Sequence, residues 1–314
     1  MAWWSPRPPF SSTASAAAAI VPLSLGLLPK LESAEPHALE AALPGWLAAR
    51  VVTLTAPGPA MLRVPRGRFV MGSSLQAIMG AAELCQRDAP TEVCRPRTFA
   101  GEQFQHTVEL SGYWLDRTEV TVAEYDRCVE QHRCSAPPYA AGADRFRKPE
   151  YPVSLVAWED ARKFCTWRGA RLPTEAEFER ASRGSAGRQF PWGNLYNSRV
   201  SNHGRYGVAD TDGRDGFEEL APVASYPEGR TPDGFVDLAG NVAEWVSDRY
   251  APAYAKQTVR NPQGPGASST GVQRVVRGGH FKSPAVWLRG AARDSQPPGE
   301  RFPHLGFRCA KSAP

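Results

Sequence analysis

Apolar and polar residues alternate in two stretches of the first half of the chain, which predicts short strands there. From Met61 to Met71 the alternation is interrupted at Arg66 and Gly67, so we expect a strand, a turn and a second strand. His106 to Leu115 alternates again and predicts one further strand. We expect the cysteine-bounded stretch between these strands to be a loop.

Three helices are predicted after these strands. Two of them open with a Thr-x-x-Glu capping box, in which each side chain bonds the backbone N–H of the other residue. The remaining helix has apolar residues at helical spacing and ends at Gly169. The expected helices cover residues 122–131, 158–168 and 174–182.

Beyond Gly184 the hydrophobic pattern is almost aperiodic. Only Arg274–Arg277, which is followed by two glycines, and Gly306–Cys309 are interpreted as strands. The chain contains 28 glycines and 29 prolines, which favour turns and irregular connections. The predicted fold class is therefore α+β, rich in loops, with short strands and a few helices.

The composition indicates a folded chain, because 42% of its 314 residues are hydrophobic. The net charge of +5 comes from scattered Lys and Arg, so it gives no support to a nucleic-acid partner.

The N-terminal region is similar to a secretion signal, since Arg7 precedes an apolar run from Ala14 to Leu28. Pro22 interrupts that run, which is too short and broken for a stable transmembrane span. We expect a leader segment at 1–30, a linker at 31–57 and a single domain at 58–314.

Six cysteines occur, and none of the close pairs has the CxxC spacing of a zinc or redox site. An even number suits three disulfides, which would require an oxidising compartment and an extracytoplasmic location. The alternative is six buried free thiols in a cytoplasmic protein. The expected pairs are Cys85–Cys94, Cys128–Cys134 and Cys165–Cys309.

The stretch from Asp237 to Trp245 places two carboxylates and an amide around Gly240, a pattern that favours calcium. Hard cations prefer oxygen ligands, and a glycine allows backbone carbonyls to turn inward. The stretch is interpreted as too irregular for an ordinary helix or strand. The alternative is a polar turn followed by an aromatic core residue.

Seven short blocks, in order along the chain, resemble the formylglycine-generating enzyme (sulfatase-modifying factor) family. Each block alone is weak, but seven in the right order between about Gly58 and Ala310 are specific. The resemblance implies a formylglycine-generating-enzyme-like, C-type-lectin-related fold with bound Ca²⁺. The blocks are Val64–Ser73, Thr118–Thr121, Arg171–Glu179, Phe190–Asn194, Gly240–Asn241 with Glu244–Trp245, Arg277–Gly279 and Leu305–Arg308.

The resemblance also implies two calcium sites and a long-range disulfide between Cys165 and Cys309. The first implied site consists of the side chains of Asn202 and Asp215 with the carbonyls of His203 and Phe217. The second consists of the side chains of Asp237 and Glu244 with the carbonyls of Gly240 and Val242.

The sequence departs from the family in the cleft segment 280–290. There the family's reaction uses a cysteine pair to bind copper, and this segment contains no cysteine. Two cleft positions carry His280 and His304, which with Asp294 or Glu300 as a third ligand could form a replacement site for Fe or Cu. The alternative is that both histidines line the cleft without a metal.

Arginines and Trp287 are the remaining cleft candidates. Arginines here could grip a carboxylate or phosphate, although Arg293 and Arg308 could equally be ion-pair partners in the core. The arginines concerned are Arg277, Arg289, Arg293, Arg301 and Arg308.

Three functions remain open from the sequence. The first is a calcium-stabilised binding or accessory protein for a peptide or small molecule, without formylglycine chemistry. The second is a non-heme metal oxidase or oxygenase acting on a peptide or small molecule. The third is a structural domain with an idle cleft, because a fold does not fix a function.

Overall fold

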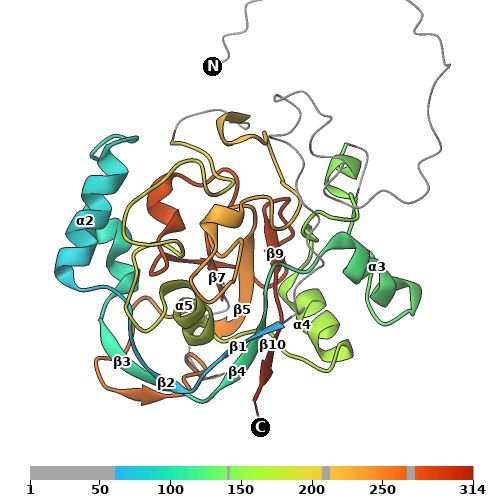
Figure 1. The fold of residues 1–314 in the computed structure, drawn as a ribbon, viewed down its shortest axis with the longest axis horizontal. Coiled ribbons are helices and arrows are strands. Elements are labelled where there is room, and N and C mark those ends of the chain that lie inside the picture. Colours follow the sequence, from blue (N-terminus) through green and yellow to red (C-terminus); the bar gives the residue numbers. More distant parts are fainter. Residues whose placement is uncertain (1–60, 140–141, 207–212, 267–272, 314) are drawn as a thin grey trace, which may run out of the picture. The chain divides into compact units, whose positions relative to one another are not determined.

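The computed structural model describes residues 61–139, 142–206, 213–266 and 273–313 (Figure 1). The expected leader at 1–30 and linker at 31–57 lie outside the described residues.

Three small sheets form the framework of the described domain. The first has the order β1 (Met61–Val64), β4 (Tyr113–Asp116), β10 (Ala310–Ser312). The second has the order β2 (Gly67–Met71), β3 (His106–Leu110), β6 (Val259–Arg260). The third has the order β8 (Arg293–Gln296), β7 (Arg274–Arg277), β5 (Ala243–Arg249), β9 (Leu305–Phe307).

Pairing is antiparallel except between β3 and β6 and between β5 and β9. The parallel register places Glu244 of β5 opposite Gly306 of β9. This pairing holds β9 beside β5, and it brings Arg308, which follows β9, close to Glu244.

The helices carry the caps that the sequence predicts. Thr121 and Thr174 each accept the backbone N–H three residues on, while Glu124 and Glu177 accept the N–H of the capping threonine. The α-helices are α2 (Leu75–Gln86), α3 (Val122–Glu130), α4 (Trp158–Trp167) and α5 (Glu175–Arg183). Short 3-10 turns are η3 (Pro96–Glu102), η4 (Asp144–Phe146), η5 (Gly213–Asp215), η6 (Pro227–Gly229) and η7 (Ala285–Leu288).

The strand, turn and second strand expected from Met61 to Met71 are present as β1 and β2, which join different sheets. One expectation needs correction. The single strand expected from His106 to Leu115 is two strands, because the chain turns at Ser111 and Gly112.

Helix α2 lies in the region expected to be a loop. It opens at Ser74, whose side chain accepts the N–H of Ala77, and buries its apolar face. Only Ser74 caps it, and its first turn has no acidic residue, so it lacks the capping-box pattern.

The interpretation of Asp237–Trp245 as wholly irregular is wrong for its second half, since Ala243, Glu244 and Trp245 begin β5. This strand is almost entirely buried, so its sequence does not alternate. The expected last strand is also displaced, because β9 ends at Phe307 and β10 begins after Cys309.

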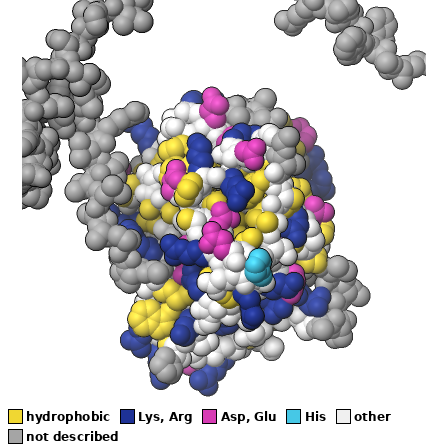
Figure 2. Space-filling view, turned by 90° about the vertical axis from the view of Figure 1, so that its right-hand side faces the viewer, with side chains coloured by type: hydrophobic (Ala, Val, Ile, Leu, Met, Phe, Trp, Pro, Cys, Tyr) yellow, Lys and Arg dark blue, Asp and Glu magenta, His cyan; other side chains and the backbone are white. Residues whose placement is uncertain are grey.

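All six cysteines form the three expected disulfides. The bond from Cys165 to Cys309 joins α4 to the end of the chain beside the fully buried Trp245 and Phe307. Among the described residues, no helix has the length and apolar character needed to span a bilayer. On the face drawn in Figure 2, basic, acidic and apolar side chains are interspersed.

Candidate functional site

A buried arginine, Arg308, organises the interior beside the long-range disulfide. Its side chain is fully buried and donates to both carboxylate oxygens of Glu244, at 2.7 to 3.0 Å. It also donates to the carbonyls of Val236 and Asp237, at 3.1 Å each. Arg308 therefore fixes the start of the Asp237 loop against β5.

A third carboxylate, Glu119, lies in the same place. It is 1% exposed, and within the described part of the chain neither of its oxygens has a hydrogen-bond partner. Burial, followed by the charges of Asp237 and Glu244, raises the pKa of Glu119 well above its ordinary value. Burial likewise raises the pKa of Asp237 and of Glu244.

These groups leave an excess of negative charge when all are ionised, because three carboxylates face the buried guanidinium of Arg308 and Arg117 acts on Asp237 alone. Leaving buried carboxylates uncompensated is expensive, and a divalent cation would remove that cost. In the described ranges no three His, Cys, Asp or Glu side chains converge closely enough to hold a metal by themselves. A cation here would therefore need backbone carbonyls and water as further ligands.

In the first predicted calcium loop, Asp215 is held by the backbone of the residue that follows Asn202. Asp215 accepts the backbone N–H groups of His203 and Phe217, at 2.7 and 3.2 Å. The side-chain nitrogen of Asn202 donates to the carbonyl of Glu219 at 2.7 Å, whereas its Oδ1 is buried without a partner among the described residues. A buried amide oxygen without a hydrogen-bond partner suits a hard cation.

The two predicted calcium loops touch each other at Gly240. A Cβ added there would lie 2.2 Å from the carbonyl oxygen of Asn202, and Gly240 has a φ of +89°. The backbone N–H of Asn241 donates to the same carbonyl at 2.8 Å. Glycine is needed at position 240 for both conformation and space.

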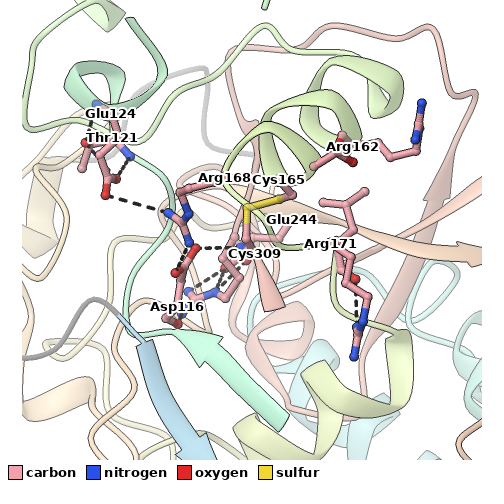
Figure 3. Close-up of a disulfide and its surroundings, with 12 residues drawn as sticks. Asp116, Thr121, Glu124, Arg162, Cys165, Arg168, Arg171, Glu244 and Cys309 are labelled. Carbon is pink, nitrogen blue, oxygen red and sulfur yellow. Dashed lines mark hydrogen bonds and ion pairs between the residues drawn. A yellow bond between two sulfur atoms is a disulfide. The ribbon is translucent and has the colours of Figure 1, made fainter. Parts of the chain in front are cut away.

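Figure 3 shows the Cys165–Cys309 disulfide beside Glu244 and Asp116, with Arg168 directed at Asp116. Asp116 is buried, pairs with Arg168 and accepts the backbone N–H of Cys309 at 2.8 Å. The disulfide therefore holds the segment around Cys309 beside the buried carboxylates Asp116 and Glu244.

The cleft predicted from the sequence is a cavity of about 170 Å³ next to Gly278 and Gly279. His280, Trp287 and Arg293 line it, whereas His304 stacks on His280 with ring centroids 4.1 Å apart. The ring of Phe302 stacks in turn on His304 at 5.1 Å. His280 of the cleft is thus the end of an aromatic stack, and no described residue that lines the cavity is a cysteine.

Both histidines are neutral at physiological pH. Burial, followed by His304 and Lys282, lowers the pKa of His280 to about 3, and burial and Lys282 lower that of His304 to about 4. Nδ1 of His280 accepts the backbone N–H of Lys282 at 3.1 Å, which assigns the proton of the neutral ring to Nε2. The lone pair of Nδ1, which is the only one this ring could offer to a metal, is therefore already occupied by the hydrogen bond from Lys282.

The expected third metal ligand is not brought to the histidines. Asp294 lines the same cavity but is exposed, and no group of three potential ligand side chains exists in the described residues. The structure assembles the histidine pair of the predicted site and not the rest of it.

The cleft arginines are ion-pair partners, which is the alternative that the sequence left open for Arg293 and Arg308. Arg293 forms a bidentate pair with Glu175 at 2.8 Å, and Arg289 forms one with Glu102 at 2.6 and 2.9 Å. Arg277 is fully buried against Glu179 at 2.7 Å. The other two are also paired, Arg301 with Asp160 and Arg308 with Glu244.

Sequence reasoning missed Glu119 and a second cavity beside Asp248. Glu119 belongs to the block Thr118–Thr121, which served only to identify the family. Glu119 and Asp237 are far apart along the chain, so no local pattern predicts that they meet. Asp248 lies at the end of β5, the strand that the pattern did not reveal.

The fold and these sites define a loop-rich α+β domain with a carboxylate-rich interior and a shallow cleft. The family model for the sulfatase-modifying factor enzyme 1-like domain matches residues 48–313, so the chain belongs to that family. It is 34% identical over 306 residues to the formylglycine-generating enzyme of Streptomyces coelicolor, covering 82% of this chain and 93% of that protein.

Two further relatives extend the comparison. The formylglycine-generating enzyme of Bos taurus is 31% identical, covering 81% of this chain and 75% of that protein. The inactive C-alpha-formylglycine-generating enzyme 2 of Bos taurus is 36% identical over a shorter match, 56% of this chain and 55% of that protein.

The structure of PvdO from Pseudomonas aeruginosa has the same fold, with a TM-score of 0.61 and 24% identity over 81% of this chain and 94% of that one. The structure of CarF matches with a TM-score of 0.51 and 18% identity over 81% of this chain and 98% of that one. Membership of the formylglycine-generating enzyme fold predicted from the seven blocks is confirmed.

Proposed function

We propose that this protein is a calcium-stabilised, extracytoplasmic member of the family that binds a peptide or small molecule in its cleft and does not generate formylglycine. One observation carries the proposal. All six cysteines are committed to disulfides, and the cleft segment 280–290 has none. The family's chemistry requires thiolates for copper and for the substrate thiol.

The cleft offers groups for binding instead. Trp287 supplies an apolar surface, and Nε2 of His280 carries an N–H donor. A relative named as an inactive formylglycine-generating enzyme supports the idea that the fold persists without the reaction.

Calcium is proposed at the second loop because the buried carboxylates Glu119, Asp237 and Glu244 need a positive charge. It is proposed at the first loop because the buried Oδ1 atom of Asn202 has no hydrogen-bond partner among the described residues. The extracytoplasmic location is proposed because three disulfides persist in oxidising compartments.

The second candidate is a non-heme metal oxidase or oxygenase that binds Fe or Cu at His280 and His304. The stacked pair favours this function, since imidazole suits both metals. The occupied lone pair of His280 opposes it.

Elemental analysis of the purified protein tests the two functions against each other. The proposal expects stoichiometric calcium and only trace iron or copper, in wild type and in His280→Ala alike. Stoichiometric iron or copper that disappears in His280→Ala would overturn the proposal in favour of the oxidase.

A further inference from the structure

A second cavity of about 420 Å³ shares Arg293 with the cleft and is not used by the proposed function. It is bounded by the start of α5, the end of β5 and the segment 251–265. Its walls have an apolar part that includes Met71, Ala176, Ala251, Tyr254, Val259 and Pro262. The polar and charged residues on its walls are His106, Glu175, Asp248, Arg249, Gln257, Gln263 and Arg293. A pocket of several hundred Å³ that combines apolar surface with placed polar groups is typical of a small-molecule site.

Two carboxylates, Glu175 and Asp248, line this cavity. Asp248 is 3% exposed, and it accepts the N–H of Glu175 at 2.9 Å and the hydroxyl of Ser247 at 2.8 Å. Both bonds end at Oδ2. Among the described residues Oδ1 has no donor, so it remains able to accept one from a molecule in the cavity.

The neighbouring acid does not share this property. Glu175 is neutralised by the bidentate guanidinium of Arg293 and accepts the hydroxyl of Tyr254 at 2.9 Å. Arg293 is in turn held by the carbonyls of Gly101 and Ala251. The charges of Glu175 and Arg293 therefore neutralise each other, and Asp248 is left as the buried charge.

Arg274 attracts Asp248 electrostatically, but among the described residues no cationic side chain donates a hydrogen bond to it. The guanidinium of Arg274 lies over the ring of Trp158 at 3.6 Å and donates to the carbonyl of Ser247. Arg249 also lines the cavity but is partly exposed, so solvent screens its charge. Burial, followed by the charge of Glu175, raises the pKa of Asp248 to about 7.

We propose that this cavity binds a small organic amine in its ammonium form, with Asp248 as the anionic partner and the apolar walls around the hydrocarbon part. An ammonium group supplies both the missing hydrogen-bond donor and the missing positive charge. A buried carboxylate kept without a counter-charge costs stability, and such groups are typical of functional sites. The proposal is independent of the cleft and of calcium.

Titration with n-butylammonium at pH 8, followed by ligand-observed NMR, tests this site. The neutral n-butanol, of similar size, is the comparison probe. We expect n-butylammonium to bind the wild-type protein about tenfold or more tightly than n-butanol, as the strength of charged hydrogen bonds implies. Asp248→Asn should weaken n-butylammonium binding by a similar factor and leave n-butanol binding unchanged.

Two further variants control the experiment. Asp88→Asn removes an exposed acid at the end of α2 and should not affect either probe. Ala255→Phe places a ring at an exposed position of the cavity wall and should weaken binding of both probes. Equal binding of the two probes, equal binding by Asp248→Asn, or no detectable n-butylammonium binding would each overturn the proposal.

Discussion

The Asp248→Asn substitution should stabilise the protein, and the gain should grow with pH. The carboxylate is buried, and its pKa is raised from 3.8 to about 7 by burial and by Glu175. An asparagine keeps an oxygen that can accept the bonds from Glu175 and Ser247 but carries no charge.

The sign of this effect follows from proton binding. Between pH 4 and pH 7 the native protein holds a proton on Asp248 that the unfolded chain has lost, so wild-type stability falls as pH rises through this window. At about 1.4 kcal/mol per pH unit, the full cost reaches about 4 kcal/mol above pH 7. Between pH 5 and pH 8 the advantage of Asp248→Asn should therefore increase by about 2.5 kcal/mol.

Urea unfolding at pH 5, 6, 7 and 8, with disulfides intact, measures this difference. Other titrating groups are common to both proteins and cancel in the comparison, and Asp88→Asn controls for a change of net charge. An advantage that does not depend on pH, or one that shrinks as pH rises, would refute the reasoning about this carboxylate.

Further predictions concern calcium and the long disulfide. Calcium at one hundred times its Kd should stabilise the protein by about 2.7 kcal/mol over chelator, as measured by thermal unfolding, and Glu244→Ala should lose much of this gain. Glu119→Gln should also lose calcium-dependent stability. In chelator this variant should be at least as stable as wild type, because it removes a buried charge. If thermal unfolding of wild type, Glu244→Ala and Glu119→Gln is unaffected by chelator, calcium at this site is excluded. Replacing Cys165 and Cys309 by alanine opens a loop of 144 residues and should lower the free energy of unfolding by about 5 kcal/mol in the chain-entropy model. Peptide mapping of the wild type should find the two cysteines linked.

Local signals in the sequence were sufficient for several elements. The capping boxes at Thr121 and Thr174 predict two helices because the interaction involves only residues three apart. The Cys165–Cys309 bond follows from the resemblance and from the even count of cysteines. The family itself follows from the order of seven blocks.

Features that depend on tertiary burial could not be predicted in this way. Strand β5 is buried on both faces, so it has no alternation to reveal it. The roles of Arg289 and Arg293 depend on partners far along the chain, Glu102 and Glu175, which no local pattern connects to them. The same distance hid Glu119 from the predicted calcium site.

The absence of formylglycine chemistry is the central claim, and a direct conversion assay tests it. The pure protein is incubated with copper, oxygen, a reductant and a sulfatase-type cysteine peptide, and the product is weighed by mass spectrometry. We predict no aldehyde above a no-protein control, because the segment 280–290 offers no thiolate and every cysteine is in a disulfide. Copper-dependent aldehyde formation above that control would contradict the account.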